Sequence, residues 1–376
     1  MVQFLQTSDW QIGMKGGELG EAGPIVREVR ISSIHNILKS AREHAVDFVL
    51  MCGDAFEHNM VSQDDVKKVI TILNQYSDIP VYLLPGNHDS IGAGSVYDRD
   101  IFVRVENLNV IRTCDPIEVP GAVLHPCPIL SRSMMGDITK DMPEVRGLSG
   151  IHIGVAHGSQ MGAFPAPNWE DVNFLIGRDC VDRTGIDYLA LGHWHSHRTF
   201  QDTVGIVRIA YSGTHEQTGY GEDNAGLCLL VEIDDKGGTP KIEPIRTGQL
   251  TWVSKEFEVK DSSSLIELKA YFETIKGIDM VKLSLFGDLP LENKEELDNI
   301  LEFQGTMHKN FAIETHSLNV RAPVQSERPL EFKDPVLSQS DEHLRELLAN
   351  ETEPERRNVI IEALALLGKL GKEAIY

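Results

Sequence analysis

Five short segments of this chain place carboxylate, amide or imidazole side chains directly after apolar runs that are typical of strands. These segments are Ser8-Asp9-Trp10-Gln11, Gly53-Asp54-Ala55-Phe56, Gly86-Asn87-His88-Asp89, Ala156-His157-Gly158 and Gly192-His193-Trp194-His195. In an open α/β sheet the carboxyl ends of the strands form the binding crevice, so we expect these side chains to meet at one edge. The convergence of all five segments indicates a metal site.

A pair of divalent cations needs a bridging carboxylate, terminal ligands and room for a water molecule whose pKa the cations lower. Asp54 suits the bridge, because each of its two oxygens can face one ion. The remaining candidate ligands are two pairs spaced two residues apart and two single side chains: Asp9 with Gln11, His193 with His195, Asn87 and His157. Manganese accepts both oxygen and imidazole donors and is our first choice, with Mg²⁺ as the alternative.

Strands alternating with helices must position these segments over about residues 1–250. The predicted strands are Phe4–Thr7, Phe48–Cys52, Val81–Leu84, Ile151–Ala156, Tyr188–Leu191, Ile206–Tyr211 and Leu227–Ile233. Apolar residues at helical spacing fill the first two gaps, at Ile34, Ile37, Leu38, Ala41 and Ala45, and at Val66, Val69, Ile70 and Leu73. This order predicts an α/β domain.

The pattern changes near Thr251. Three predicted strands (Phe257–Val259, Met280–Phe286 and Phe311–Thr315) and two predicted helices (Leu265–Ile275 and Lys294–Phe303) indicate a small α+β domain over 251–322. The remaining residues, 323–376, are interpreted as a linker containing Pro323, Pro329 and Pro335, followed by an amphipathic helix at Glu355–Leu370.

Composition excludes several classes of protein. The 376 residues exceed one ordinary domain, and 35 Lys and Arg against 57 Asp and Glu leave a net charge of −22. Bulk electrostatics therefore cannot hold the whole chain on nucleic acid. Five widely spaced cysteines suggest no disulfide framework, and no leader or long apolar segment is evident, so we expect a cytoplasmic protein with no membrane segment.

The order Asp-x-Gln, Gly-Asp, Gly-Asn-His-Asp, a single His and Gly-His-x-His resembles the calcineurin-like metallophosphoesterases. Within them, Tyr211-Ser212-Gly213-Thr214 and Gly219-Tyr220-Gly221-Glu222 make the chain similar to the DNA-repair exonucleases of the SbcD and meiotic recombination eleven type. The resemblance implies a two-sheet sandwich flanked by helices, a small α+β cap and a C-terminal helical tail.

The resemblance also implies roles for individual residues. One metal would take Asp9, Asp54 and His195, with Gln11 where the family normally has His. The second would take Asp54, Asn87, His157 and His193. His88 would stabilise the reacting phosphorus or protonate the leaving oxygen, and Asp89 could hold its imidazole. The implied partners are DNA, an SMC-like coiled-coil ABC ATPase that receives the C-terminal helix, and a second copy of the chain.

The expected function is a manganese-dependent DNA phosphodiesterase, a 3′-to-5′ repair exonuclease with added endonuclease activity. One competing hypothesis is a small-molecule or cyclic-nucleotide phosphodiesterase that uses the same site. Another is a DNA-binding scaffold subunit with weak chemistry, motivated by the net charge and by Gln11, whose neutral amide is a weaker donor than imidazole. The plain interpretation of the C-terminal helix is that its apolar stripe packs on its own domain.

Overall fold

The structure is a computed structural model that describes residues 1–376 except 132, 163–172, 276–278, 308–310, 322–333 and 374–376. The chain divides into two compact units, Met1–Thr251 and Trp252–Tyr376. Each is described by itself.

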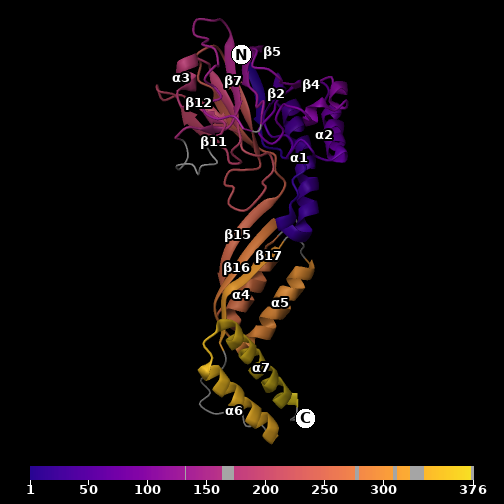
Figure 1. The fold of residues 1–376 in the computed structure, drawn as a ribbon, viewed down its shortest axis with the longest axis vertical. Helices are drawn as coiled ribbons and strands as arrows, with labels where there is room; N and C mark the ends of the chain where they lie inside the picture. The colour runs from indigo at the N-terminus through magenta and orange to yellow at the C-terminus, as the bar shows by residue number, and fades with distance from the viewer. Residues whose placement is uncertain (132, 163–172, 276–278, 308–310, 322–333, 374–376) are drawn as a thin grey trace. The chain divides into compact units, whose positions relative to one another are not determined.

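Two six-stranded sheets form the first unit (Figure 1). The first sheet has the order β14-β13-β1-β2-β3-β4, and its strands are β1 (Val2–Thr7), β2 (Phe48–Cys52), β3 (Val81–Leu84), β4 (Leu108–Val110), β13 (Leu227–Ile233) and β14 (Lys241–Arg246). The strands β1 to β4 run parallel, whereas β13 and β14 are antiparallel to their neighbours. The central strand β2 is buried along its whole length, as its unbroken Phe-Val-Leu-Met-Cys run predicts for a strand covered on both faces.

The second sheet has the order β11-β12-β10-β7-β6-β5. Its strands are β5 (Ile117–Val119), β6 (Ala122–Cys127), β7 (Ile151–His157), β10 (Tyr188–Gly192), β11 (Arg198–Gln201) and β12 (Val207–Tyr211). A separate two-stranded sheet pairs β8 (Ser159–Gln160) with β9 (Leu175–Ile176). The parallel core strands β6, β7, β10 and β12 end on the same side, which brings His157 and the Gly192–His195 segment together.

Apolar side chains from facing sides of the two sheets form one core, which includes Phe4, Phe48, Leu124 and Tyr188. The outer face of the first sheet packs on α1 (Gly23–Glu43) and α2 (Gln63–Gln75), and a third cluster joins the second sheet to α3 (Cys180–Thr184). Short 3₁₀ helices lie at Gly17–Ala22 (η1), Val96–Asp98 (η2) and Phe102–Arg104 (η3). These layers confirm the predicted α/β two-sheet sandwich flanked by helices.

A three-stranded sheet with the order β15-β16-β17 anchors the second unit. Its strands are β15 (Thr251–Glu258), β16 (Asp279–Pro290) and β17 (Phe311–Arg321), and its helices are α4 (Ser262–Glu273), η5 (Leu291–Asn293), α5 (Lys294–Met307), α6 (Pro335–Asn350) and α7 (Pro354–Glu373). One apolar cluster, built on Leu265, Leu283 and Leu297, joins α4 and α5 to this sheet.

The C-terminal segment differs from the sequence prediction in one respect. Pro335, expected within a linker, is the first residue of α6, because proline suits the first helical turn and Asp334 accepts a hydrogen bond from the Val336 N–H (2.8 Å) as the N-cap. The helices α6 and α7 pack together around Leu348, Ile361 and Leu364. The segments 322–333 and 374–376 lie outside the described residues, so Pro323 and Pro329 stay predictions.

Other differences concern short elements. Ala45 lies beyond the end of α1 with φ 50°, so it does not extend the helical stripe. Seven strands of the described residues were not predicted, and most of them are short or alternate with exposed residues: β4, β5, β6, β8, β9, β11 and β14. Across the part of the chain that the structure describes, no helix combines the length and apolarity that crossing a membrane requires.

Candidate metal centre

The loops after β1 and β2 run side by side and place three of the predicted ligands. The Asp9 N–H donates to the Gly53 carbonyl (3.0 Å), and the Gln11 N–H donates to the Asp54 carbonyl (2.9 Å). Asp9 and Asp54 are buried and Gln11 is half-buried. The backbone of Gln11 therefore lies beside Asp54, but none of the described hydrogen bonds joins its side chain to another predicted ligand.

Strained backbone marks the same loops. Asp9, Gln11, Asp54 and His193 have φ values of 54°, 44°, 55° and 108°, a region that side-chain-bearing residues rarely adopt. Among the described residues only seven non-glycine positions have positive φ, and these four are predicted ligands. Such strain costs about 1–3 kcal/mol at each position and concentrates at functional sites, which favours a functional role for these loops.

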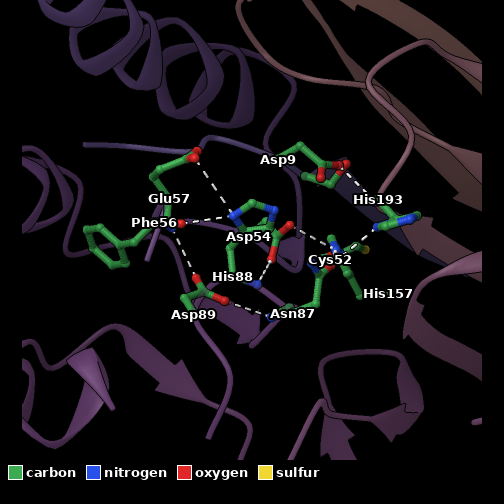
Figure 2. A network of polar contacts seen from close by, with 12 residues as sticks. Asp9, Cys52, Asp54, Phe56, Glu57, Asn87, His88, Asp89, His157 and His193 are labelled. Carbon is green, nitrogen blue, oxygen red and sulfur yellow. Dashed lines mark hydrogen bonds and ion pairs between the residues drawn. The ribbon is translucent and has the colours of Figure 1, made fainter. Parts of the chain in front are cut away.

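Asp54, Asn87, His157 and His193 form one polar cluster (Figure 2). His157 Nε2 lies 3.1 Å from Asp54 Oδ2 and donates to Asn87 Oδ1 at 2.9 Å, and His193 Nδ1 lies 3.3 Å from the same amide oxygen. His157 Nδ1 donates to the Cys52 carbonyl (2.8 Å), so Nε2 is the nitrogen that can bind a cation. The four predicted ligands of the second metal are thus linked in series, from Asp54 through His157 and Asn87 to His193.

The charges of this cluster are coupled. Burial alone would raise the pKa of Asp54, but the charge of His157 and the hydrogen bond between the two groups outweigh it and lower the pKa to about 2. Burial likewise opposes protonation of His157, yet Asp54 raises its pKa to about 9. Burial and the charge of His157 lower the pKa of His193 to about 4, which keeps that ring neutral. A cation could replace the proton on His157 Nε2.

None of the described hydrogen bonds joins His195 to that cluster, and its side chain contacts a residue for which we predicted no role. Its Nδ1 donates to Glu222 Oε1 at 2.7 Å. Burial would lower the pKa of His195, but this hydrogen bond and the charges of Asp9 and Glu222 raise it. Because Nδ1 is engaged, Nε2 is the nitrogen available to a metal.

His88 follows Asn87 and faces Asp54. Its backbone N–H donates to Asp54 Oδ1 (2.9 Å), and its Nδ1 donates to the Glu57 carbonyl (2.9 Å), with Glu57 Oε1 at 3.9 Å (Figure 2). The His88 side chain is 38% exposed, and none of the described hydrogen bonds engages its Nε2.

Asp89 differs from the sequence expectation. Its carboxylate accepts from the backbone N–H groups of Gly86 (2.7 Å) and Phe56 (3.0 Å) and from the Tyr97 hydroxyl, and none of the described hydrogen bonds joins it to His88. Asp89 is fully buried, and those three donors surround its carboxylate. It therefore connects the loops that contain Phe56 and Gly86. The His88 ring is held by the Glu57 carbonyl instead. Burial and the charge of Asp54 raise its pKa to about 6.

Two glycines leave room for the ligands. A Cβ at Gly53 would lie 2.1 Å from His157 Nδ1, and one at Gly86 would lie 2.1 Å from Asp54 Oδ1. Both distances are far shorter than a van der Waals contact, so the Gly-Asp and Gly-Asn-His-Asp segments need glycine for a reason beyond turn geometry.

The residues present fit a bound cation. Asp9, Asp54 and His157 each place one potential ligand atom within 4.8 Å of the others. Asp9 Oδ1 is buried and has no hydrogen-bond partner among the described residues, an arrangement that is costly without a cation. Carboxylate, amide and imidazole donors together suit Mn²⁺.

Sequence reasoning missed the residues that position the ligands. Arg30 of α1 is buried, and its guanidinium donates to the carbonyls of Asp9 (3.1 Å) and Trp10 and to that of Glu216. An arginine within the apolar face of the helix was the available signal. Glu57 had a weaker signal, because it is simply an acidic residue near a motif, whereas Glu222 ends the Gly219–Glu222 segment of the resemblance but had no role assigned to it.

The fold and the site together define a metallophosphoesterase. A model of the calcineurin-like phosphoesterase family matches residues 2–197, and the chain belongs to that family. The family is one of phosphoesterases, and it typically binds a dinuclear metal site.

One curated relative is the uncharacterized metallophosphoesterase YhaO of Bacillus subtilis (strain 168), which is 25% identical over 259 residues. The match covers 65% of this chain and 59% of the length of YhaO, so the chain spans little more than half of that relative.

Similar solved structures include TT1561 of Thermus thermophilus and a dimetal phosphatase from Danio rerio. The match to TT1561 has 12% sequence identity and a TM-score of 0.40, and it covers 65% of this chain and 99% of the TT1561 chain. The match to the dimetal phosphatase has 10% sequence identity and a TM-score of 0.39, and it covers 64% of this chain and 98% of the phosphatase chain.

Proposed function

We propose that this protein is a manganese-dependent DNA phosphodiesterase, a 3′-to-5′ repair exonuclease with added endonuclease activity, that works with an SMC-like ABC ATPase. One observation carries the hydrolase part. Buried Asp54 contacts His157, which in turn contacts Asn87, and it accepts from the backbone of His88, in a chain of the calcineurin-like phosphoesterase family. The DNA part rests on the order of the motifs and on the segments at residues 211–214 and 219–222.

The residues have distinct parts in the reaction. Asp54 would lie between two cations, with Asp9, His195 and Gln11 on one side and Asn87, His157 and His193 on the other. When bound, the pair of cations polarises the phosphoryl group and lowers the pKa of water. His88 keeps Nδ1 on the Glu57 carbonyl, which aims Nε2 at the reacting group, where it can donate a proton to the leaving oxygen.

The experiment compares three proteins on end-labelled duplex DNA in Mn²⁺. Wild type should release nucleotides. His88→Ala should lose cleavage and keep its metal content, because no described contact makes His88 a ligand. Asp54→Ala should lose both, because it removes the carboxylate at the centre of the cluster. Normal cleavage by His88→Ala would refute the catalytic assignment.

The net charge of −22 favours a second candidate, a phosphodiesterase of small molecules or cyclic nucleotides. Polyanionic DNA would be repelled by most of the surface, so binding would depend on local basic groups, the cations and a partner, and would weaken steeply with salt. Hydrolysis of bis-p-nitrophenyl phosphate without any cleavage of DNA would favour this candidate.

The partner proposal concerns α7. Leu364 packs inside the α6–α7 pair, but Val359 and Leu366 are 66% and 65% exposed. We propose that these side chains dock on the coiled-coil base of the ATPase and that nuclease domains pair as homodimers. Val359→Glu with Leu366→Glu should abolish co-purification with that ATPase, whereas light scattering of the isolated protein should still report a dimer. A monomer there would refute the homodimer.

A further inference from the structure

The segment that follows β12 lies against two predicted ligands of the first metal. Thr214 donates from its hydroxyl to the Asp9 carbonyl (2.8 Å) and from its N–H to the His195 carbonyl (2.9 Å). Arg30 donates to the Asp9 carbonyl as well and to the Thr214 hydroxyl oxygen (3.3 Å). The backbone of both ligands is thus fixed by residues outside the metal-binding motifs.

Glu222 continues this support to the side chain of His195. Its Oε1 accepts from His195 Nδ1 (2.7 Å), and its Oε2 accepts from the N–H groups of Thr218 (2.6 Å) and Gly219 (3.2 Å). The Thr218 hydroxyl donates to the carboxylate too and lies 3.2 Å from His195 Nδ1. The side chain of Glu222 is only 18% exposed, and both of its oxygens are engaged by one imidazole and one turn of the loop.

This arrangement decides which imidazole nitrogen carries the proton. An ionised carboxylate only accepts hydrogen bonds, so the neutral ring beside it is protonated at Nδ1 and keeps its lone pair on Nε2. The partners of metal-binding histidines in proteins commonly act in this way, and their loss costs roughly 10–100-fold in metal affinity.

We propose that Glu222 is the positioning residue of the first-metal side. It holds His195 in the tautomer that leaves Nε2 for the cation. Because the same carboxylate accepts from the N–H groups of Thr218 and Gly219, it also connects the 218–222 loop to His195. The inference rests on the proposed metal site and goes beyond it, because it names a residue that acts through His195. The matching role on the other side belongs to the Cys52 carbonyl, which fixes His157 through its Nδ1 (2.8 Å).

The decisive variants are Glu222→Ala and Glu222→Gln. An amide at position 222 can still accept from His195 through its oxygen, but its NH₂ group would then face the N–H groups of Thr218 and Gly219. We therefore expect a partial defect in Glu222→Gln and a larger one in Glu222→Ala. The matched control is Asp223→Asn, which removes the same charge at the exposed neighbouring position.

Two measurements test the role. Nitrogen-15 spectra of the histidine rings in metal-free protein, at a pH where the rings are neutral, should show His195 protonated at Nδ1 in wild type and in Asp223→Asn. The His195→Gln variant assigns the signal. Glu222→Ala should lose this single tautomer, a change that general loosening of the fold would not produce selectively.

Calorimetric titration with Mn²⁺ gives the second readout. Wild type and Asp223→Asn should bind two ions, whereas Glu222→Ala should bind one of them roughly 10–100-fold more weakly. An unchanged His195 tautomer or two unchanged affinities in Glu222→Ala would overturn the proposal. If Glu222→Ala does not fold, Glu222→Gln decides by the same criteria. Wild type that binds no Mn²⁺ would refute the metal site itself, and the ring spectra would still judge Glu222.

Discussion

Gly86→Ala is the substitution whose effect follows most directly from the geometry of the site. The added Cβ would lie 2.1 Å from Asp54 Oδ1 and 2.5 Å from the Asp54 backbone nitrogen, whereas ordinary contacts are 3.4–4 Å. Oδ1 would have to retreat by more than about 1 Å, several times the roughly 0.2 Å within which metal–ligand distances hold. The backbone nitrogen cannot retreat, because Asp54 lies in a loop hydrogen-bonded to the loop after β1.

We therefore expect Gly86→Ala to lose high-affinity Mn²⁺ binding and to lower the free energy of unfolding by about 1–3 kcal/mol, the usual cost of overpacking. Calorimetry with Mn²⁺ and urea denaturation measure the two effects. Gly219→Ala is the control: its Cβ would meet no atom within 4 Å, so stability should change by less than about 0.5 kcal/mol. Wild-type affinity and stability in Gly86→Ala would show that the pocket is not built as described.

Three further predictions concern other parts of the first unit. Gln11→His should lower the Mn²⁺ concentration needed for activation, because imidazole is the stronger donor, and equal titrations would remove Gln11 from the ligand set. Tyr97→Phe should lower the free energy of unfolding by about 1–3 kcal/mol in urea melts, because buried Asp89 loses a donor, and an unchanged melt would count against that brace. His125 and His152 are buried 3.0 Å apart, and burial and the neighbouring charges lower the pKa of His125 to about 4. His125 therefore binds a proton more readily in the unfolded chain than in the folded one. As the pH falls from about 7.5 to about 5, the free energy of unfolding should decrease by about 2 kcal/mol. His125→Leu should flatten that slope, and an equally steep slope would contradict the assignment.

The sequence predicted which side chains lie near one another because the signal for each of them is local. Each follows an apolar run. The expected single sheet edge is instead formed by two sheets, because β1, β2 and β3 belong to the first sheet and β7 and β10 to the second, and the ends of β2 and β10 meet at Cys52 and Gly192. The convergence of Asp54, Asn87 and His157 needs no more information than this, although the role of each as a ligand stays a prediction.

The supporting residues could not be predicted in the same way, because their partners are distant in sequence. His88 and the Glu57 carbonyl are 31 residues apart, and His195 and Glu222 are 27 apart. The misassigned role of Asp89 has the same origin: adjacency to His88 suggested a hydrogen bond between them, whereas the tight turn directs the carboxylate to the N–H of Gly86. Helix α6 was missed because Pro335 was interpreted as a break rather than as a helix start.

The hydrogen bonds that hold the ligand loops determine how much the site must rearrange when a cation binds. Asp9, Asp54 and His193 hold a backbone conformation that costs about 1–3 kcal/mol each, and that cost must be offset when no cation is present. The structure shows what offsets it: the loops after β1 and β2 hydrogen-bond to each other, and Arg30 and Thr214 hold the Asp9 carbonyl. Cation binding then needs little rearrangement beyond loss of the proton on His157 Nε2. Affinity for Mn²⁺ should consequently rise with pH up to the pKa of His157, near about 9 in the metal-free protein. A pH-independent affinity, measured calorimetrically between about pH 6 and about pH 9, would mean that the cation is bound elsewhere.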